Sequence, residues 1–151
     1  MDRQTANEDC PMPDRSQDDR VREILSQSRA VVVVGMSPKP ERPSHQVGLY
    51  LRDHGYTVFP VHPAAKEIEG LKVYPSLDAI PENENIDIVT LFISGDRVME
   101  LVEPCAGTGA KVVYFQPGAE NPEAEEKARQ MGLEVFSGRC IMADHKRLMR
   151  S

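Results

Sequence analysis

The sequence predicts a small α/β domain that is doubly wound around a parallel sheet of about five strands. Two observations support this fold class. Short apolar segments rich in valine and isoleucine, of which "AVVVVG" at residues 30–35 is the clearest, alternate with helical patterns along the chain. These segments are continuous apolar runs, as expected of strands that helices bury on both faces. The 151 residues are enough for one such domain.

The elements of the first third follow from local patterns. The first 17 residues have no apolar period and contain two prolines, so we expect a disordered acidic tail at 1–17 and the domain at 18–151. Apolar residues at helical spacing predict a short helix over residues 21–28. The valine run at 30–35 is the first strand. After a proline-rich loop, a second apolar stripe predicts a helix that ends at Gly55.

The rest of the chain continues the alternation. The four remaining strands are expected at residues 56–61, 86–93, 111–115 and 133–136. Residues 64–75 are predicted to be mostly irregular, with a short extended piece at 71–74 and a single helical turn at 76–80.

Three further helices are predicted. An apolar stripe indicates a helix that opens near Ser94. The sequence Asn121-Pro122-Glu123 combines an N-cap, a proline at the first helical position and an acid in the first turn, and so starts the next helix. Residues 143–150 form the last one.

Composition and charge exclude several classes of protein. Much of the net charge of −6 lies at the start of the chain, because the first 19 residues hold six acidic and two basic side chains. The nearly neutral body has no basic stripe, which argues against a nucleic acid partner. The longest apolar run is too short to span a membrane, and no signal peptide precedes it, so we expect a cytoplasmic protein. The three cysteines form no CxxC pair, which argues against a disulfide framework and against a metal site.

The turn after the first strand is a candidate anion site. Ligands of doubly wound sheets bind at the carboxyl ends of the strands, here the loops at residues 35–44, 60–66, 93–97 and 116–121. The first loop offers main-chain N–H groups and the N-terminus of the following helix. It also carries Lys39 and Arg42. A single glycine after a strand is a weak signal, and a plain strand-to-helix turn with solvated charges explains this loop equally well.

The end of the second strand narrows the choice of ligand. Nicotinamide enzymes normally place an acid there to bind the ribose hydroxyls of the cofactor. This strand instead ends in Pro60-Val61-His62-Pro63, with Lys66 in the same loop. A lysine suits a ribose phosphate, so a dehydrogenase that uses NAD is disfavoured.

Four stretches together resemble a known family. They are "VVGMSPKPERPSHQVGLYLRDHGYTVFPVHP", "EIEGLKVYPSLDAIP", "YFQPGAENPEAEEKARQMGL" and "GRCIM". In this order they look like the small single-domain CoA-binding proteins of prokaryotes, which are similar to the CoA-binding domain of the succinyl-CoA synthetase alpha subunit. The resemblance covers roughly residues 19–146 and implies a Rossmann-like fold that binds coenzyme A.

The resemblance also implies which residues would contact CoA. The loop after the first strand would meet the phosphates, the Pro-Val-His-Pro turn with its lysine would flank the adenosine 3′-phosphate, and the ends of the third and fourth strands would line the rest of CoA. The residues carried over are Gly35, Met36, Ser37, Pro38, Lys39, Pro60, Val61, His62, Pro63, Lys66, Ile93, Ser94, Gln116, Pro117 and Gly118. His62 departs from the family pattern, which usually has an asparagine there.

The expected function is non-catalytic binding of CoA or an acyl-CoA for sensing, storage or presentation. No Ser-His-Asp order, paired carboxylates or Walker-type loop is found, so we expect no catalytic residues. Two alternatives stay open. One is a subunit of a split acyl-CoA synthetase that docks on an ATP-grasp partner, and the other is an oxidoreductase component that binds NAD(P). A homo-oligomer is also open.

Cys140 in "GRCIM" follows the fifth strand, at the sheet edge where ligands bind. One hypothesis places it near the CoA thiol, where it forms a mixed disulfide. The alternative is that Cys140 is a small buried apolar residue.

Overall fold

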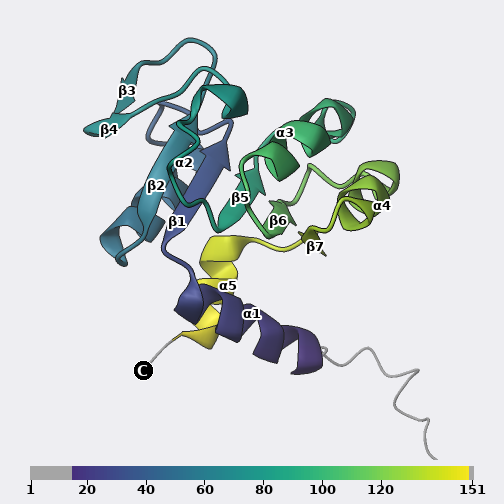
Figure 1. Ribbon diagram of the computed structural model, residues 1–151. Coiled ribbons are helices and arrows are strands. Elements are labelled where there is room, and N and C mark those ends of the chain that lie inside the picture. The colour runs from purple at the N-terminus through teal and green to yellow at the C-terminus, as the bar shows by residue number, and fades with distance from the viewer. Residues whose placement is uncertain (1–14, 150–151) are drawn as a thin grey trace, which may run out of the picture.

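The computed structural model describes residues 15–149, which form five α-helices, three of them packed on one face of a five-stranded sheet and two on the other (Figure 1). The helices are α1 (Arg15–Gln27), α2 (Pro43–Asp53), α3 (Val102–Gly107), α4 (Pro122–Gln130) and α5 (Ile141–Leu148). The strands of the large sheet are β1 (Ala30–Val34), β2 (Thr57–Val61), β5 (Ile88–Leu91), β6 (Val112–Phe115) and β7 (Glu134–Ser137).

The large sheet is parallel and has the order β2-β1-β5-β6-β7. The chain moves from β1 to one neighbour, β2, and later to the other neighbour, β5. Because parallel crossovers are right-handed, this reversal puts the connecting helices on opposite faces of the sheet. The carboxyl ends of β1 and β5 therefore border the topological switch point, where ligands of such folds bind. The predicted doubly wound α/β class with five strands is confirmed.

The valine run of β1 packs into both layers of the core. Val31 and Val33 face α1, α2 and α5, whereas Val32 and Val34 face α3 and α4. All four are at least nine-tenths buried. A central strand covered on both faces has no polar positions to expose, which explains why the sequence shows a continuous run and no alternation.

The segment between β2 and β5 is more regular than expected. It contains a two-stranded hairpin of β3 (Glu67–Ile68) and β4 (Leu71–Lys72), followed by a short 3-10 turn, Leu77–Ala79. The two residues between β3 and β4 both have positive φ, 50° at Glu69 and 83° at Gly70. Two such residues in a row are typical of the turn that joins tight hairpins. The predicted extended piece at 71–74 is found as β4, its partner β3 was not predicted, and the helical turn predicted at 76–80 is found at Leu77–Ala79.

The helix predicted to open near Ser94 begins later. The chain first forms a 3-10 segment, η3 (Val98–Leu101), and α3 starts only at Val102. Pro104 is the physical reason: it has no N–H to donate to the carbonyl four residues before it, and its ring clashes with that carbonyl. A continuous α-helix from residue 94 through 104 is therefore excluded, and Pro104 is tolerated in the first turn of α3.

The start of α4 agrees with its pattern, whereas α1 begins six residues and α5 two residues before the predicted starts. Asn121 caps α4 through its side-chain oxygen, which accepts a hydrogen bond of 3.1 Å from the N–H of Ala124. Helix α1 begins at Arg15, so the predicted tail boundary at residue 17 falls inside a helix. Residues 1–14 of that tail lie outside the described residues. Among residues 15–149 no helix is long and apolar enough to cross a membrane; the cytoplasmic location stays a prediction.

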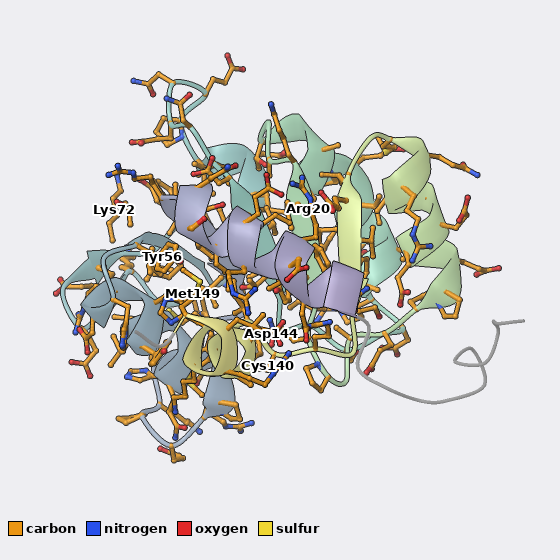
Figure 2. The ribbon with its side chains drawn as sticks, turned by 90° about the horizontal axis from the view of Figure 1, so that it is seen from below. Arg20, Tyr56, Lys72, Cys140, Asp144 and Met149 are labelled. Atoms are coloured by element: carbon orange, nitrogen blue, oxygen red, sulfur yellow. The ribbon has the colours of Figure 1, made fainter. Side chains whose placement is uncertain are left out.

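A partly buried ionic network links the two ends of the described chain. Arg139, just after β7, contacts Asp18 of α1 at 3.0 Å and Asp144 of α5 at 2.9 Å. Arg147 contacts Asp18 at 3.0 Å. The buried hydroxyl of Tyr114 donates to Asp144 over 3.0 Å. Figure 2 shows the side of the molecule that carries α1 and α5, with Asp144 and Cys140 labelled beside α5.

Candidate functional site

Gly35 lies at the switch point, where β1 ends against the end of β5. Its φ is 85°, and its N–H donates to the carbonyl of Val61 over 2.8 Å. A Cβ at this position would lie only 2.6 Å from the carbonyl oxygen of Phe92. Both the conformation and the space therefore require glycine, because any side chain would push the two strand ends apart.

Two cavities open at the carboxyl edge of the sheet, and Gly35 lines both. The first, the β2-side cavity, has a volume of about 350 Å³ and lies on the face covered by α3. It is lined by Val34, Gly35, Val61, Pro63, residues 75–78, Ile93, Arg97, Glu100, Leu101 and Pro104. The second, the α5-side cavity, has a volume of about 480 Å³. It is lined by Gly35, Ser37, residues 42–44, Gln46, Val47, Phe92, Gln116, Pro117, Cys140 and Met142. An elongated ligand that crosses the strand ends above Gly35 can occupy both cavities.

The loop from Gly35 to α2 presents hydroxyl donors to the α5-side cavity. Ser44 Oγ accepts a hydrogen bond of 2.9 Å from the N–H of Ser37. Ser37 Oγ in turn accepts one of 3.1 Å from the N–H of Lys39. Because both oxygens already accept from the main chain, their O–H groups are the parts left to interact with a ligand. Together with the N-terminus of α2, they suit an anionic group.

Basic side chains lie at this edge, together with the carboxylates of Asp78 and Glu100 that line the β2-side cavity. Lys39, Arg42 and Lys66 are exposed, and within residues 15–149 none of the three forms an ion pair. Arg97, which lines the β2-side cavity, has only Glu100 near it, at 3.7 Å between two exposed side chains. These cations provide a local attraction for anions that the net charge of the protein conceals.

His62 replaces the asparagine of the family pattern and reproduces its contacts with the main chain. Its Nδ1 accepts hydrogen bonds from the N–H groups of Ala64, at 3.1 Å, and Ala65, at 3.0 Å. An asparagine carbonyl can accept in the same way. Since Nδ1 accepts, the proton of the neutral ring is on Nε2, which is left as a donor.

His45 was not predicted to take part, yet it holds the anion loop in place. It is almost fully buried, and its Nδ1 lies 2.8 Å from the carbonyl oxygen of Ser37. Its Nε2 lies 3.4 Å from a carboxylate oxygen of Glu69, in the turn between β3 and β4. The ring is held to the loop after β1 through Nδ1, whereas Nε2 has no hydrogen-bond partner among the described residues. No sequence pattern indicated the contact with Glu69, because it depends on how the hairpin packs on α2.

The residues carried over from the family fall into three groups. Those that line a cavity are Gly35, Ser37, Val61, Pro63, Ile93, Gln116 and Pro117. Those at the surface beside the cavities are Pro38, Lys39, His62 and Lys66. Those with structural contacts are Met36, Pro60, Ser94 and Gly118.

The residues of the third group also make contacts within the protein. Met36 is completely buried, and its sulfur fills the space beside Gly48, where a Cβ would lie 2.5 Å away. Pro60 is a buried strand residue whose carbonyl accepts from Tyr74 over 2.9 Å. Ser94 Oγ hydrogen-bonds Asp96, and the carbonyl of Gly118 accepts from Gly95. These contacts shape the loops, and the ligand contacts expected of the four residues stay predictions.

The two described cysteines have different surroundings. Cys105 lies in the core, and burial raises the pKa of its thiol to about 12. Cys140 is half-buried, precedes α5 and lines the α5-side cavity. Cys140 thus combines features of both hypotheses, because it packs against the core on the α5 side and also lines the α5-side cavity.

Comparison with known proteins gives a consistent result. A family model described as a CoA binding domain matches residues 29–146. The uncharacterised protein YneT of Bacillus subtilis is 35% identical over 125 residues, which cover 83% of this chain and 91% of that protein. A solved structure of a hypothetical protein from Pyrococcus horikoshii has a TM-score of 0.84 and 44% identity, with 88% of this chain and 92% of that chain covered.

Longer relatives contain a similar segment. An ADP-forming acetate–CoA ligase of Archaeoglobus fulgidus is 30% identical over 129 residues. The match covers 79% of this chain but only 18% of the ligase. This chain therefore spans about a fifth of the length of that ligase.

Proposed function

Since the chain belongs to the CoA binding domain family, we propose that it binds coenzyme A or an acyl-CoA at the carboxyl edge of its sheet and has no catalytic residues of its own. The observation that carries the proposal is the pair of cavities that share Gly35 in their linings. CoA is an elongated anion, and the site is an elongated space bordered by unpaired cations.

The order of chemical groups in CoA fits the order of groups along the site. The β2-side cavity has an apolar lining from Val61, Pro63 and Ile93, which suits the adenine ring. The hydroxyls of Ser37 and Ser44 and the start of α2 suit the diphosphate. Lys66 and the Nε2–H of His62, beside the end of β2, suit the 3′-phosphate of the ribose.

The same region explains why NAD is the weaker candidate. An acid that accepts from the ribose hydroxyls is expected at the end of β2. Here that position holds His62, whose Nδ1 accepts hydrogen bonds from the main-chain N–H groups of Ala64 and Ala65. A donor in this place favours a phosphate and disfavours a free ribose hydroxyl pair.

Calorimetric titration of the purified protein with CoA, acetyl-CoA, NAD⁺ and ATP tests the proposal. We expect saturable binding of CoA. Replacing Lys66 by alanine is expected to weaken it about tenfold, or ~1.4 kcal/mol, through loss of a charge-assisted contact. Lys111 is a matched control, because it is also exposed but lies before β6, at the opposite edge of the sheet. Binding of NAD⁺ or ATP in preference to CoA would overturn the proposal.

A second candidate function is a subunit of a split acyl-CoA synthetase with an ATP-grasp partner. It is favoured by the match to the alpha subunit of an ADP-forming acetate–CoA ligase from Pyrococcus furiosus, of which this chain covers 28%. Co-expression with an ATP-grasp protein encoded beside it tests this function. A stable complex that forms acetyl-CoA would support the subunit role, and two proteins that elute separately would leave the binding role alone.

A further inference from the structure

His45 is a buried histidine with one ring nitrogen bonded and the other left without a partner. Its Nδ1 lies 2.8 Å from the carbonyl oxygen of Ser37. A carbonyl oxygen can only accept, so Nδ1 carries the proton of this hydrogen bond. In the neutral ring, Nε2 is therefore a bare acceptor, and it is buried without a hydrogen-bond partner among residues 15–149. Such an atom is costly to bury unless something satisfies it.

The group that faces Nε2 is a carboxylate. An oxygen of Glu69 lies 3.4 Å from Nε2. While the ring is neutral, both atoms are acceptors and their lone pairs repel each other. A second proton, taken from the solvent onto Nε2, makes this nitrogen a donor and turns the contact into an ion pair. The Glu69 side chain is 47% exposed, so it can rotate its oxygen onto the new N–H. The doubly protonated ring thus satisfies an atom that the neutral ring leaves unpaired.

The main chain of Glu69 is an independent reason to assign its side chain a role. Its φ is 50°, and it is the only residue other than glycine with a positive φ in the described part of the chain. Asparagine, aspartate and glycine are the residues that favour this position of a hairpin turn. A glutamate there is unfavourable for the main chain, and its contact with His45 gives a reason for it.

The other charges near the ring come from α2. His45 lies in the first turn of α2, and the positive end of the helix disfavours a cation there. Arg52, near the other end of α2, donates to the main-chain carbonyl of Glu69 over 2.9 Å and also lies 3.3 Å from Asp53. From the loop after β1, the ring meets the uncharged carbonyl of Ser37. The Glu69 carboxylate is therefore the group that favours a charged ring.

We infer that His45 is a proton-dependent positioning residue: when doubly protonated, it pairs with Glu69, links the loop after β1 to the β3–β4 hairpin and strengthens the binding of an anion by that loop. The inference rests on the proposed function, because the anion in question is the diphosphate of CoA. The affinity for CoA is then expected to rise as the pH falls through the range in which histidines gain their second proton. By linkage, CoA binding favours proton uptake by the ring.

Calorimetric titration with CoA at about pH 6 and about pH 8 tests this inference. Glu69→Gln keeps the ring and removes the acid that faces it. Glu67→Gln is the matched control, because Glu67 is exposed in the same hairpin and its loss changes the net charge equally. The ratio of the CoA affinities at the two pH values is expected to be roughly three- to fivefold larger in wild type and Glu67→Gln than in Glu69→Gln. The phosphates of CoA and His62 also titrate, but they are common to all three proteins.

An NMR titration of the histidine ring nitrogens in the protein without CoA tests the pair by itself. Nε2 of His45 is expected to gain its proton at a higher pH in wild type than in Glu69→Gln. The same midpoint in both proteins, or the same affinity ratio in all three, would overturn the inference while the proposed function stands. If wild type binds no CoA at either pH, the proposed function fails, and the role of His45 in CoA binding fails with it.

Discussion

Replacing Gly35 by alanine perturbs the point at which the two cavities meet. Because φ at this position is 85°, an alanine would have to adopt the left-handed region, which destabilises the fold by about 1–2 kcal/mol. Its Cβ would also lie 2.6 Å from the carbonyl oxygen of Phe92. Because that neighbour is main chain, it cannot rotate away, and overpacking of this kind typically costs ~1–3 kcal/mol more. The free energy of unfolding is therefore expected to fall by about 2–5 kcal/mol.

Gly55→Ala is the matched control for this variant. Gly55 has a similar φ of 97°, but no atom lies within 4 Å of an added Cβ. The free energy of unfolding of Gly55→Ala is expected to fall only by the cost of the left-handed conformation, about 1–2 kcal/mol. Urea denaturation of the two variants measures the difference, and CoA titration should show weaker binding for Gly35→Ala alone. Equal losses of stability in the two variants would refute the reasoning, because the contact with Phe92 would then carry no cost.

Two further predictions concern the ionic network and the thiols. Hydrogen bonds from Arg147 and Arg139 lower the pKa of Asp18 from 3.8 to about 2, so its stabilising contribution is complete above the ordinary pKa and is lost as the pH falls toward 2. We expect Asp18→Asn to have a lower free energy of unfolding than wild type at neutral pH, and this difference to disappear as the pH falls toward 2. A difference that is the same at every pH would contradict this. In a variant without Cys10, iodoacetamide is expected to modify Cys140 and to spare Cys105, as measured by mass spectrometry. Saturating CoA is expected to slow the modification of Cys140. A rate that does not depend on CoA would show that the ligand does not cover the Cys140 thiol.

The fold was largely predictable because its strongest signals are local. The valine run of β1 and the cap at Asn121 each specify their element without help from distant residues. The hairpin of β3 and β4 was not predicted, because its strands have two residues each and show no measurable period. The late start of α3 was readable in principle from Pro104, but the apolar stripe outweighed it.

The site was predictable only in part, because cavities form between elements. Gly35 and Ser37 follow a strand directly, so their place at the sheet edge comes from topology. Gln116 was expected to line the ligand site. That its side-chain amide has no hydrogen-bond partner among the described residues depends on how the ends of β5 and β6 pack, which the sequence does not show. His45 was missed for a similar reason: Glu69 reaches it only once the hairpin packs on α2.

Mapping of amide chemical shifts by NMR during a titration with CoA tests most directly whether this protein binds CoA across the ends of β1 and β5. The account predicts saturable shifts at Gly35, Ser37, Ser44 and Gln116, with little change at Lys111 on the opposite edge. An absence of shifts at saturating CoA, or shifts confined to the edge that carries Lys111, would contradict it.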